Sequence, residues 1–210
     1  MDTETPAPNN LRRLRWLLWA LVLVAVGVFA FLLSRPTIQW SRTEPGSPGF
    51  TIGGPFTLTG TDGKPFSSTA LAGKPYAVFF GFTHCPDVCP NTLGRLAKLR
   101  RQLGKGDAAL PIVFVSVDPA RDTPKVIGDY LHLFGAPIIG LTGSEAQVAD
   151  VAKRHAVYFA KVPDKDAPGG YTMDHSSQVL LFDREGRFVS TIAMEEGDAP
   201  ALAKLQRITS

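Results

Sequence analysis

The sequence has little net charge, only two cysteines, and no internal repeat or low-complexity tract. Four of its 22 lysines and arginines and two of its 19 acidic residues lie in residues 1–35, which leaves 18 basic and 17 acidic residues over 36–210. This balance provides no basic footprint for nucleic acid, so we expect no nucleic-acid partner. With 44% hydrophobic and 20% charged residues, the chain is neither wholly disordered nor a polytopic membrane protein. Its 210 residues fit one ordinary domain and an anchoring segment better than a multidomain enzyme.

An apolar stretch near the N-terminus has the composition of a membrane anchor. It runs from Trp16 to Leu33 and contains 18 residues without a charge, WLLWALVLVAVGVFAFLL. At about 1.5 Å per residue, this is close to the minimum length that spans a hydrocarbon core. A cleaved signal peptide would have a shorter apolar core and a small-residue cleavage site after it, so we favour an uncleaved anchor.

The charges around this stretch predict its orientation. Arginines crowd its front at Arg12, Arg13 and Arg15, whereas Arg35 alone follows it closely. The positive-inside rule therefore places the N-terminus in the cytoplasm. We expect a single-pass protein of the cell inner (cytoplasmic) membrane, with its C-terminal domain on the periplasmic or extracytoplasmic side. That compartment is oxidising.

Composition divides the chain into four parts. We predict a cytoplasmic tail at residues 1–15, a transmembrane anchor at 16–34, a linker at 35–49 and a folded domain at 50–210. Residues 41–50 (SRTEPGSPGF) are rich in Pro, Gly and Ser and have no hydrophobic period, which is typical of a tether.

Two continuous apolar runs predict the centre of the domain. Tyr76–Phe82 and Ile112–Val117 have the length of strands and the composition of strands buried on both faces. Between them, Pro90–Leu103 carries leucines at helical spacing, and Gly104 follows as a helix stop. Strand, helix and strand in this order predict a βαβ crossover.

The remaining segments extend this unit. They are a first hairpin around Asp62-Gly63-Lys64, helices over 124–134 and 144–154, a closing hairpin from 178 to 192, and a last helix near 199–207. The predicted fold class is α/β: a thioredoxin-like fold with an N-terminal β-hairpin extension and a C-terminal β-hairpin, preceded by one transmembrane helix.

The two cysteines lie in Thr83–Pro90, directly after the first buried strand and before the helix. Three residues separate Cys85 from Cys89, one more than in the thioredoxin redox motif. In a first helical turn this spacing can bring both sulfurs to one side, where they bond to each other or share a metal. Pro90 suits the first helical position, which predicts Cys89 as the cap and helix N–H groups that favour a thiolate. A purely structural disulfide would close a tiny loop and stabilise the fold little, so a redox or metal pair is favoured.

Two sulfurs rarely complete a metal site, and four histidines could provide a third ligand: His84, His132, His155 and His175. We interpret His132 and His155 as solvated or core-edge side chains, and His84 as a neighbour that tunes the adjacent thiol. His175 lies in the polar segment 171–177, which we interpret as a loop approaching the cysteine end of a thioredoxin-like sheet. From the pattern alone, His175 is as often simply solvent-exposed.

Three motifs carry a resemblance to a known family. They are FGFTHCPDVCP at 80–90, VDPARDTP at 117–124 with Tyr130, and DHS at 174–176. Together, in this order and spacing, they resemble the SCO/SenC family of membrane-anchored copper proteins, which assist assembly of cytochrome c oxidase. The resemblance covers about residues 50–208.

The resemblance implies that Cys85, Cys89 and His175 are the metal ligands. Soft thiolates with one imidazole suit a copper ion, as three-coordinate Cu(I) and also as Cu(II). Zinc would usually take a fourth ligand, and the chain has no further cysteine. Asp174 is a candidate for orienting the histidine ring or its loop, and Asp87 for modulating the thiols. Each aspartate could equally be a simple turn residue.

The D-P-x-R-D-T-P stretch also carries charge. We interpret Asp118, Arg121 and Asp122 as a cluster that fixes its loop or forms a partner surface, and not as ligands. Thr123 or Asp122 would cap the helix that follows Pro124.

Three functions remain open on the sequence. The main prediction is a copper chaperone that passes copper to the copper-centre subunit of cytochrome c oxidase, with a periplasmic copper donor or thiol reductant as a further partner. The alternative is a thiol–disulfide oxidoreductase or redox sensor, which needs Cys85 and Cys89 as its redox pair but not His175. A peroxidase rests on fold analogy alone, and Thr83 departs from the T-x-x-C spacing that it would need.

Overall fold

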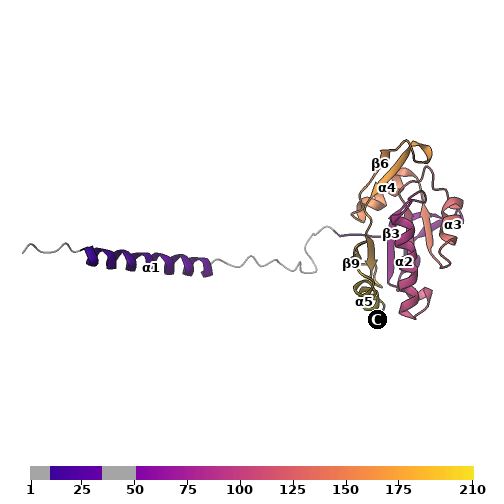
Figure 1. Cartoon of the computed structure of the whole chain (residues 1–210). Helices are drawn as coiled ribbons and strands as arrows, with labels where there is room; N and C mark the ends of the chain where they lie inside the picture. The colour runs from indigo at the N-terminus through magenta and orange to yellow at the C-terminus, as the bar shows by residue number, and fades with distance from the viewer. Residues whose placement is uncertain (1–9, 35–50) are drawn as a thin grey trace, which may run out of the picture. The chain divides into compact units, whose positions relative to one another are not determined.

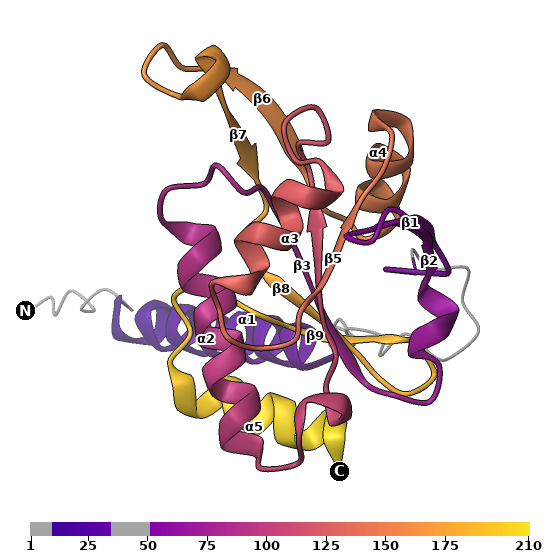
Figure 2. The same cartoon turned by 90° about the vertical axis from the view of Figure 1, so that its right-hand side faces the viewer.

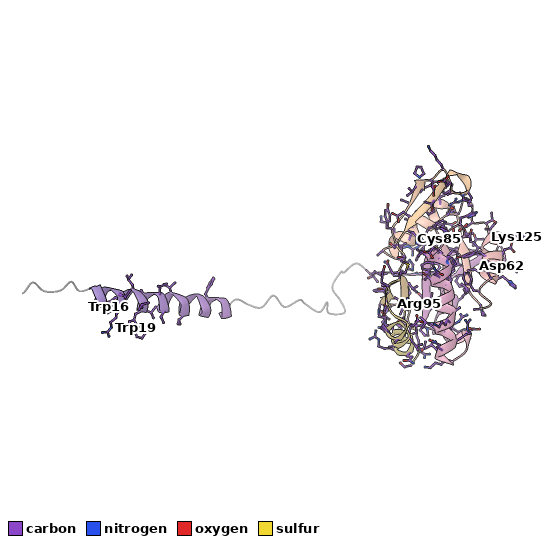
Figure 3. The ribbon with its side chains drawn as sticks, viewed as in Figure 1. Trp16, Trp19, Asp62, Cys85, Arg95 and Lys125 are labelled. Carbon is purple, nitrogen blue, oxygen red and sulfur yellow. The ribbon has the colours of Figure 1, made fainter. Side chains whose placement is uncertain are left out.

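The computed structural model describes residues 10–34 and 51–210, and the chain forms two units, 1–49 and 50–210. The first unit contains the helix α1 (Asn10–Ser34), from which the exposed side chains of Trp16 and Trp19 extend (Figure 3). Over the described residues, no helix reaches the combined length and apolarity of a membrane span. The anchor therefore stays a prediction. Residues 1–9 of the predicted tail and the predicted linker lie outside the described residues.

The second unit is built on a seven-stranded mixed sheet with the order β2-β1-β5-β4-β3-β8-β9. At its centre, β3 (Tyr76–Gly81), β4 (Ile112–Ser116) and β5 (Ile139–Thr142) run parallel. On the other side of β3, β8 (Val179–Phe182) pairs antiparallel with it, and β9 (Phe188–Ile192) pairs antiparallel with β8. Every residue of β3 and β4 is buried, as the continuous apolar runs predicted.

The opposite edge of the sheet carries the predicted N-terminal hairpin. Strands β1 (Thr57–Gly60) and β2 (Pro65–Ser67) pair antiparallel, and β1 also pairs antiparallel with β5. Gly63 adopts a φ of 76° in the turn between them, a conformation that glycine reaches without strain. Both predicted hairpins are thus present, one at each edge of the sheet.

The predicted crossover is confirmed by α2 (Val88–Leu103), which connects β3 to β4. Its buried face includes Leu93, Leu96 and Leu99, and Gly104 ends it in the left-handed conformation with a φ of 65°. Figure 2 shows α2 and α3 (Pro124–His132) in front of the sheet.

The other helices also begin where the sequence places them. The Thr123 hydroxyl accepts from the N–H of Val126 and so caps α3, and Ser144 forms a capping box at the start of α4 (Glu145–Arg154). The last helix, α5 (Asp198–Thr209), packs beside α2. The arrangement is the predicted α/β, thioredoxin-like fold.

A second, two-stranded sheet stands apart from the main one. Strands β6 (Phe159–Pro163) and β7 (Tyr171–His175) pair antiparallel only with each other, and the hairpin projects at one end of the domain (Figures 1 and 2). The expectation of a loop over 171–177 is therefore wrong for its first five residues, because His175 is the last residue of a strand. No residue of either strand is fully buried, so the alternation that marks a half-buried strand is missing.

Candidate metal site

The cysteines occupy the connection between β3 and α2, at the carboxyl edge of the parallel strands. The helix begins at Val88, and Asp87 stands at the N-cap position, so the prediction that Cys89 caps the helix is wrong. Cys89 is the second residue of the helix and Pro90 the third. Proline fits there because the N–H groups of the whole first turn lack helical acceptors.

The helix start directs a donor at the half-buried sulfur of Cys85. The backbone N–H of Cys89 donates to Cys85 Sγ over 3.4 Å, as the predicted stabilisation of a thiolate requires. Cys89 is fully buried and Cys85 is half-buried. Directly beneath them, a Cβ on Gly81 would lie 2.8 Å from Cys89 Sγ, so the strand must end in glycine for the sulfur to fit.

The end of β7 brings the imidazole of His175 to the same place. Its Nε2 lies 3.5 Å from Cys89 Sγ, and its Nδ1 lies 2.9 Å from the carbonyl oxygen of Ser176. Because a carbonyl only accepts, Nδ1 donates its proton to Ser176, and Nε2 is the ring nitrogen that faces the sulfurs. The rings of Phe79 and Phe82 contact the imidazole edge-on, with centroids 6.1 and 5.8 Å away.

One possible ligand atom from each of Cys85, Cys89 and His175 falls within 4.8 Å of the other two. Cys85 and His175 line a cavity of about 240 Å³, together with Met173 and Asp174, and the buried Cys89 lies behind them. Cys85 lies in the turn before α2, and its sulfur is within 4.8 Å of a ring nitrogen of His175, the last residue of β7. The structure therefore brings together the three residues that the resemblance implied.

The two thiols share one proton unequally. The hydrogen bond from Cys89 lowers the pKa of Cys85 to about 4 against the opposing effect of burial, and His175 and the backbone N–H groups of Cys89 and Asp87 lower it further. The same hydrogen bond, followed by burial, raises the pKa of Cys89. At neutral pH the pair thus holds a thiolate at Cys85 and a thiol at Cys89, and metal binding must displace the buried proton.

The other three histidines are separate from the ligand group. The Nδ1 atom of His84 lies 3.1 Å from Thr83 Oγ1 and 3.6 Å from a carboxylate oxygen of Asp122. His132 is exposed on α3, and His155 is buried with its Nδ1 2.7 Å from the carbonyl of Val151. His155 is therefore deeper in the core than the interpretation as a core-edge residue implied.

The two aspartates proposed as supporting residues lie close to the site. Asp174 is exposed and lines the cavity, while the histidine ring is held by the Ser176 carbonyl. The Asp87 carboxylate accepts from the side-chain amide of Asn91 over 2.5 Å, and its backbone N–H acts on the thiolate. A role for either carboxylate in metal binding stays a prediction.

Two further residues around the site were not singled out by sequence reasoning as contributors to it. Ser176 supplies the carbonyl that selects the tautomer of His175, a backbone role that no side-chain pattern signals. Tyr130, on α3, has a buried hydroxyl without a hydrogen-bond partner among the described residues. Burial raises its pKa, and the nearby Cys89 and Cys85 raise it further, so the phenol keeps its proton.

Comparison with known proteins agrees with this geometry. A family model described as SCO1/SenC matches residues 44–210. The chain belongs to the SCO1/SenC family. It is 36% identical to the mitochondrial protein SCO2 of Saccharomyces cerevisiae, over 98% of this chain and 71% of the relative.

Solved structures of the SCO1/SenC family share the fold. ScoI of Bradyrhizobium japonicum with copper bound is 46% identical, with a TM-score of 0.67 over 75% of this chain and 99% of that one. Yeast Sco1 with copper bound is 35% identical, with a TM-score of 0.67 over 75% of this chain and 87% of that one. Copper is thus bound in structures of two relatives with this fold.

Proposed function

We propose that this chain is a membrane-anchored copper chaperone that binds copper through Cys85, Cys89 and His175. It delivers the metal to the copper-centre subunit of cytochrome c oxidase. The observation that carries the proposal is the convergence of two sulfurs and one imidazole nitrogen within 4.8 Å. Soft sulfur donors favour Cu(I), and a single imidazole nitrogen suits either copper valence.

The chemistry of the ligands supports reversible binding. Cys85 offers a thiolate without a proton to remove, whereas Cys89 must lose the proton that it shares with its partner. Loading therefore depends on pH and on both thiols being reduced. Release of copper is coupled to protonation in the same way, since a proton that returns to Cys89 opposes rebinding of the metal.

Several finer parts of the proposal rest on the sequence. The apolar stretch 16–34 holds the domain at the outer face of the cytoplasmic membrane, with the copper site on the periplasmic side. The oxidase subunit, and a periplasmic copper donor or thiol reductant, are the partners that we propose.

The test is copper stoichiometry in the full chain, solubilised in detergent, fully reduced and free of oxygen. Copper(I) is added, the excess is removed, and bound metal is counted. We expect one copper per chain, and loss or sharp weakening in Cys85→Ala, Cys89→Ala and His175→Ala. His132→Ala is the matched control, because that histidine is exposed on α3. No stable copper in the reduced, unsubstituted chain would overturn the proposal.

A second function is favoured by the unequal cysteines. A half-buried thiolate at Cys85 and a buried thiol at Cys89 have the arrangement of an attacking and a resolving cysteine. In thiol–disulfide exchange, the Cys85 thiolate attacks one sulfur of a client disulfide and the other sulfur leaves as a thiolate. Cys89 then displaces the client, so that the client is reduced and the pair is oxidised.

The histidine discriminates between the two functions. Reduction of a disulfide client by the chain should be nearly unchanged in His175→Ala, whereas copper retention should be lost. A variant that loses both activities equally would contradict a separate oxidoreductase function.

A further inference from the structure

The site is assembled from two pieces that the main sheet does not connect. The cysteines follow β3, whereas the histidine ends β7, in a hairpin that pairs with no strand of the seven-stranded sheet. A two-stranded hairpin alone is only marginally stable in water. Side-chain contacts must therefore fix the hairpin, and with it the third ligand, against the rest of the domain.

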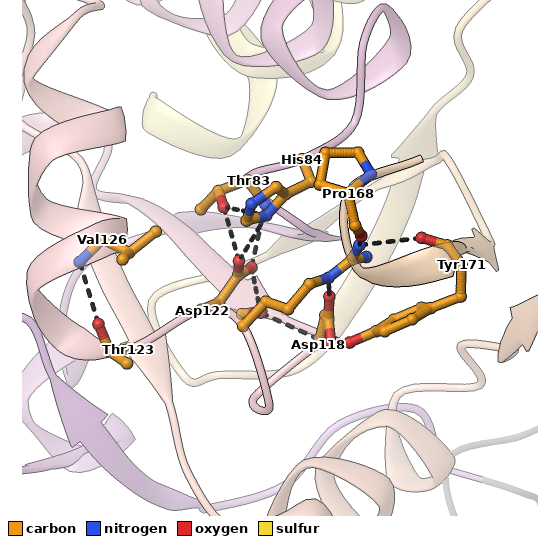
Figure 4. A network of polar contacts seen from close by, with 10 residues as sticks. Thr83, His84, Asp118, Asp122, Thr123, Val126, Pro168 and Tyr171 are labelled. Carbon is orange, nitrogen blue, oxygen red and sulfur yellow. Dashed lines mark hydrogen bonds and ion pairs between the residues drawn. The ribbon is translucent and has the colours of Figure 1, made fainter. Parts of the chain in front are cut away.

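The loop at residues 117–123, directly after β4, contacts both pieces (Figure 4). At one end, the fully buried carboxylate of Asp122 accepts from the Thr83 N–H over 3.0 Å and from its hydroxyl over 2.6 Å. The hydroxyl of Ser116 is a further donor at 2.6 Å. These bonds hold the loop to the chain two residues before Cys85.

At the other end, the loop holds the start of β7. Arg121 forms an ion pair with Asp118, and its Nη1 donates to the carbonyl oxygens of Pro168 and Tyr171 over 2.6 and 2.9 Å. The Tyr171 hydroxyl donates to the Asp118 carboxylate over 2.9 Å. Carboxylate, guanidinium and phenol thus close a ring of hydrogen bonds between the loop and the hairpin (Figure 4).

The Tyr171 ring is also held between two cations. The guanidinium carbon of Arg121 lies 3.8 Å from its centroid, and Nζ of Lys161 lies 3.6 Å from it. Each contact is attractive because the faces of an aromatic ring carry negative charge. Lys161 belongs to β6, so one ring joins the loop to both strands of the hairpin.

Strand β7 connects the anchored Tyr171 at its start to His175 at its end. Tyr171, Met173 and His175 alternate on β7 and share one face, since successive side chains of a strand point to opposite sides. We propose that Arg121 and Tyr171 are positioning residues, which set His175 Nε2 against the two sulfurs by fixing the hairpin to the loop after β4. This inference rests on the proposed copper function, and it names Arg121 and Tyr171 as the residues that hold the third ligand in place.

The first test needs no copper. In the metal-free chain, Arg121→Gln and Tyr171→Leu should increase amide hydrogen exchange of β6 and β7 at least tenfold, while exchange in β3 and β4 stays unchanged. Matched controls are Arg187→Gln, which removes a surface arginine paired with a carboxylate, and Tyr158→Leu, an exposed tyrosine beside the same hairpin. Unchanged exchange in the hairpin of both test variants would overturn the inference whatever the metal does.

The second test asks whether these residues act through His175. We expect Arg121→Gln to weaken the affinity of the chain for Cu(II) about 10- to 100-fold, as loss of residues that orient a metal ligand commonly does. The imidazole nitrogen coupling in the pulsed EPR spectrum of Cu(II) should weaken with it. In a His175→Ala background, Arg121→Gln should change the affinity less than twofold. An equal loss in both backgrounds would show that Arg121 acts elsewhere and would overturn the inference.

A milder variant guards against misfolding. Tyr171→Phe keeps the ring between its two cations and removes only the hydroxyl bond to Asp118, so it should lose less Cu(II) affinity than Tyr171→Leu. Equal losses in the two variants would contradict a role for the ring. If the unsubstituted chain binds no copper, the proposed function fails, whereas normal copper binding in Arg121→Gln overturns only the positioning inference.

Discussion

Lowering the pH from 8 to 5 should leave the rate at which iodoacetamide alkylates Cys85 nearly constant. With a pKa of about 4, the side chain is almost entirely thiolate over this range. An ordinary cysteine, with a pKa near 8.5, is only about 0.3% thiolate at pH 6 and loses reactivity about tenfold per pH unit. Cys89 is fully buried, so alkylation in the folded chain reports on Cys85.

The absolute rate is a weaker criterion than the shape of the profile. Nucleophilicity falls with pKa with a slope of about 0.4–0.5, so a thiolate whose pKa is 4.5 units lower attacks about 100-fold more slowly. At pH 6 the roughly 300-fold larger thiolate fraction offsets this loss, and the net rate is only a few times that of an ordinary thiol. A plateau between pH 5 and 8, followed by a fall near pH 4, is the distinguishing result.

The causes of the shift predict an order among variants. The hydrogen bond from Cys89 lowers the pKa of Cys85 most, so Cys89→Ala should move the midpoint upward furthest. His175→Ala should move it upward by less, and His132→Ala should leave it in place. Alkylation followed by mass spectrometry gives the rates. A tenfold rise per pH unit between pH 5 and 8 in the unsubstituted chain would refute the thiolate at Cys85.

Three further predictions concern stability. Gly81→Ala places a Cβ 2.8 Å from Cys89 Sγ and should cost about 1–3 kcal/mol in thermal unfolding, whereas Gly94→Ala, in open space on a helix, should be neutral or stabilising. Asp122→Ala removes the acceptor of three donors and should lower the free energy of unfolding in urea by about 2–4 kcal/mol; a loss below 0.5 kcal/mol would contradict the network. Burial lowers the pKa of His155, so below pH 6.5 the unfolded chain binds a proton that the folded chain does not. Stability should then fall with decreasing pH by up to about 1.4 kcal/mol per unit, and His155→Phe should remove that contribution; parallel pH profiles would refute it.

The centre of the fold could be predicted because burial on both faces leaves a plain signal. β3 and β4 are continuous apolar runs, and α2 between them has leucines at helical spacing. A parallel pair joined by a helix puts the cysteine turn at the carboxyl edge of the sheet. Only the helix start was misplaced, because proline is compatible with several positions of a first turn.

β5 was missed because its sequence carries little strand signal. It has only four residues, and Gly140 lies inside it. The reason for that glycine is packing, since a Cβ there would lie 2.5 Å from Ile127 and 2.6 Å from Leu131 on α3. Close approach of a helix to a strand therefore removed the side chain that would have identified the strand.

The β6–β7 hairpin was missed for a different reason. Only the partly buried Phe159 and Met173 pack against the core, and cations, a phenol and backbone carbonyls supply the other contacts, so Lys161 stands where an alternating pattern would need an apolar residue. The resemblance around His175 indicated a third candidate ligand, and the contacts along residues 117–123 add a physical account of how the hairpin is held near the sulfurs. Charged residues that sequence analysis assigns to a loop can therefore determine ligand geometry at a distance.

The cysteines and the histidine of the site are held by two separate parts of the fold. Cys85 and Cys89 are fixed by the buried crossover, so two sulfur ligands stay together whatever the hairpin does. His175 depends on contacts made by a hairpin outside the main sheet. On the proposed copper function, bound copper would keep its thiolates if the imidazole left, and one coordination position would then open to a ligand of a receiving protein. The polar network that anchors the hairpin would thereby govern how readily that position opens. Because Cu(II) has the stronger preference for nitrogen, removal of this network should weaken the binding of Cu(II) more than the binding of Cu(I).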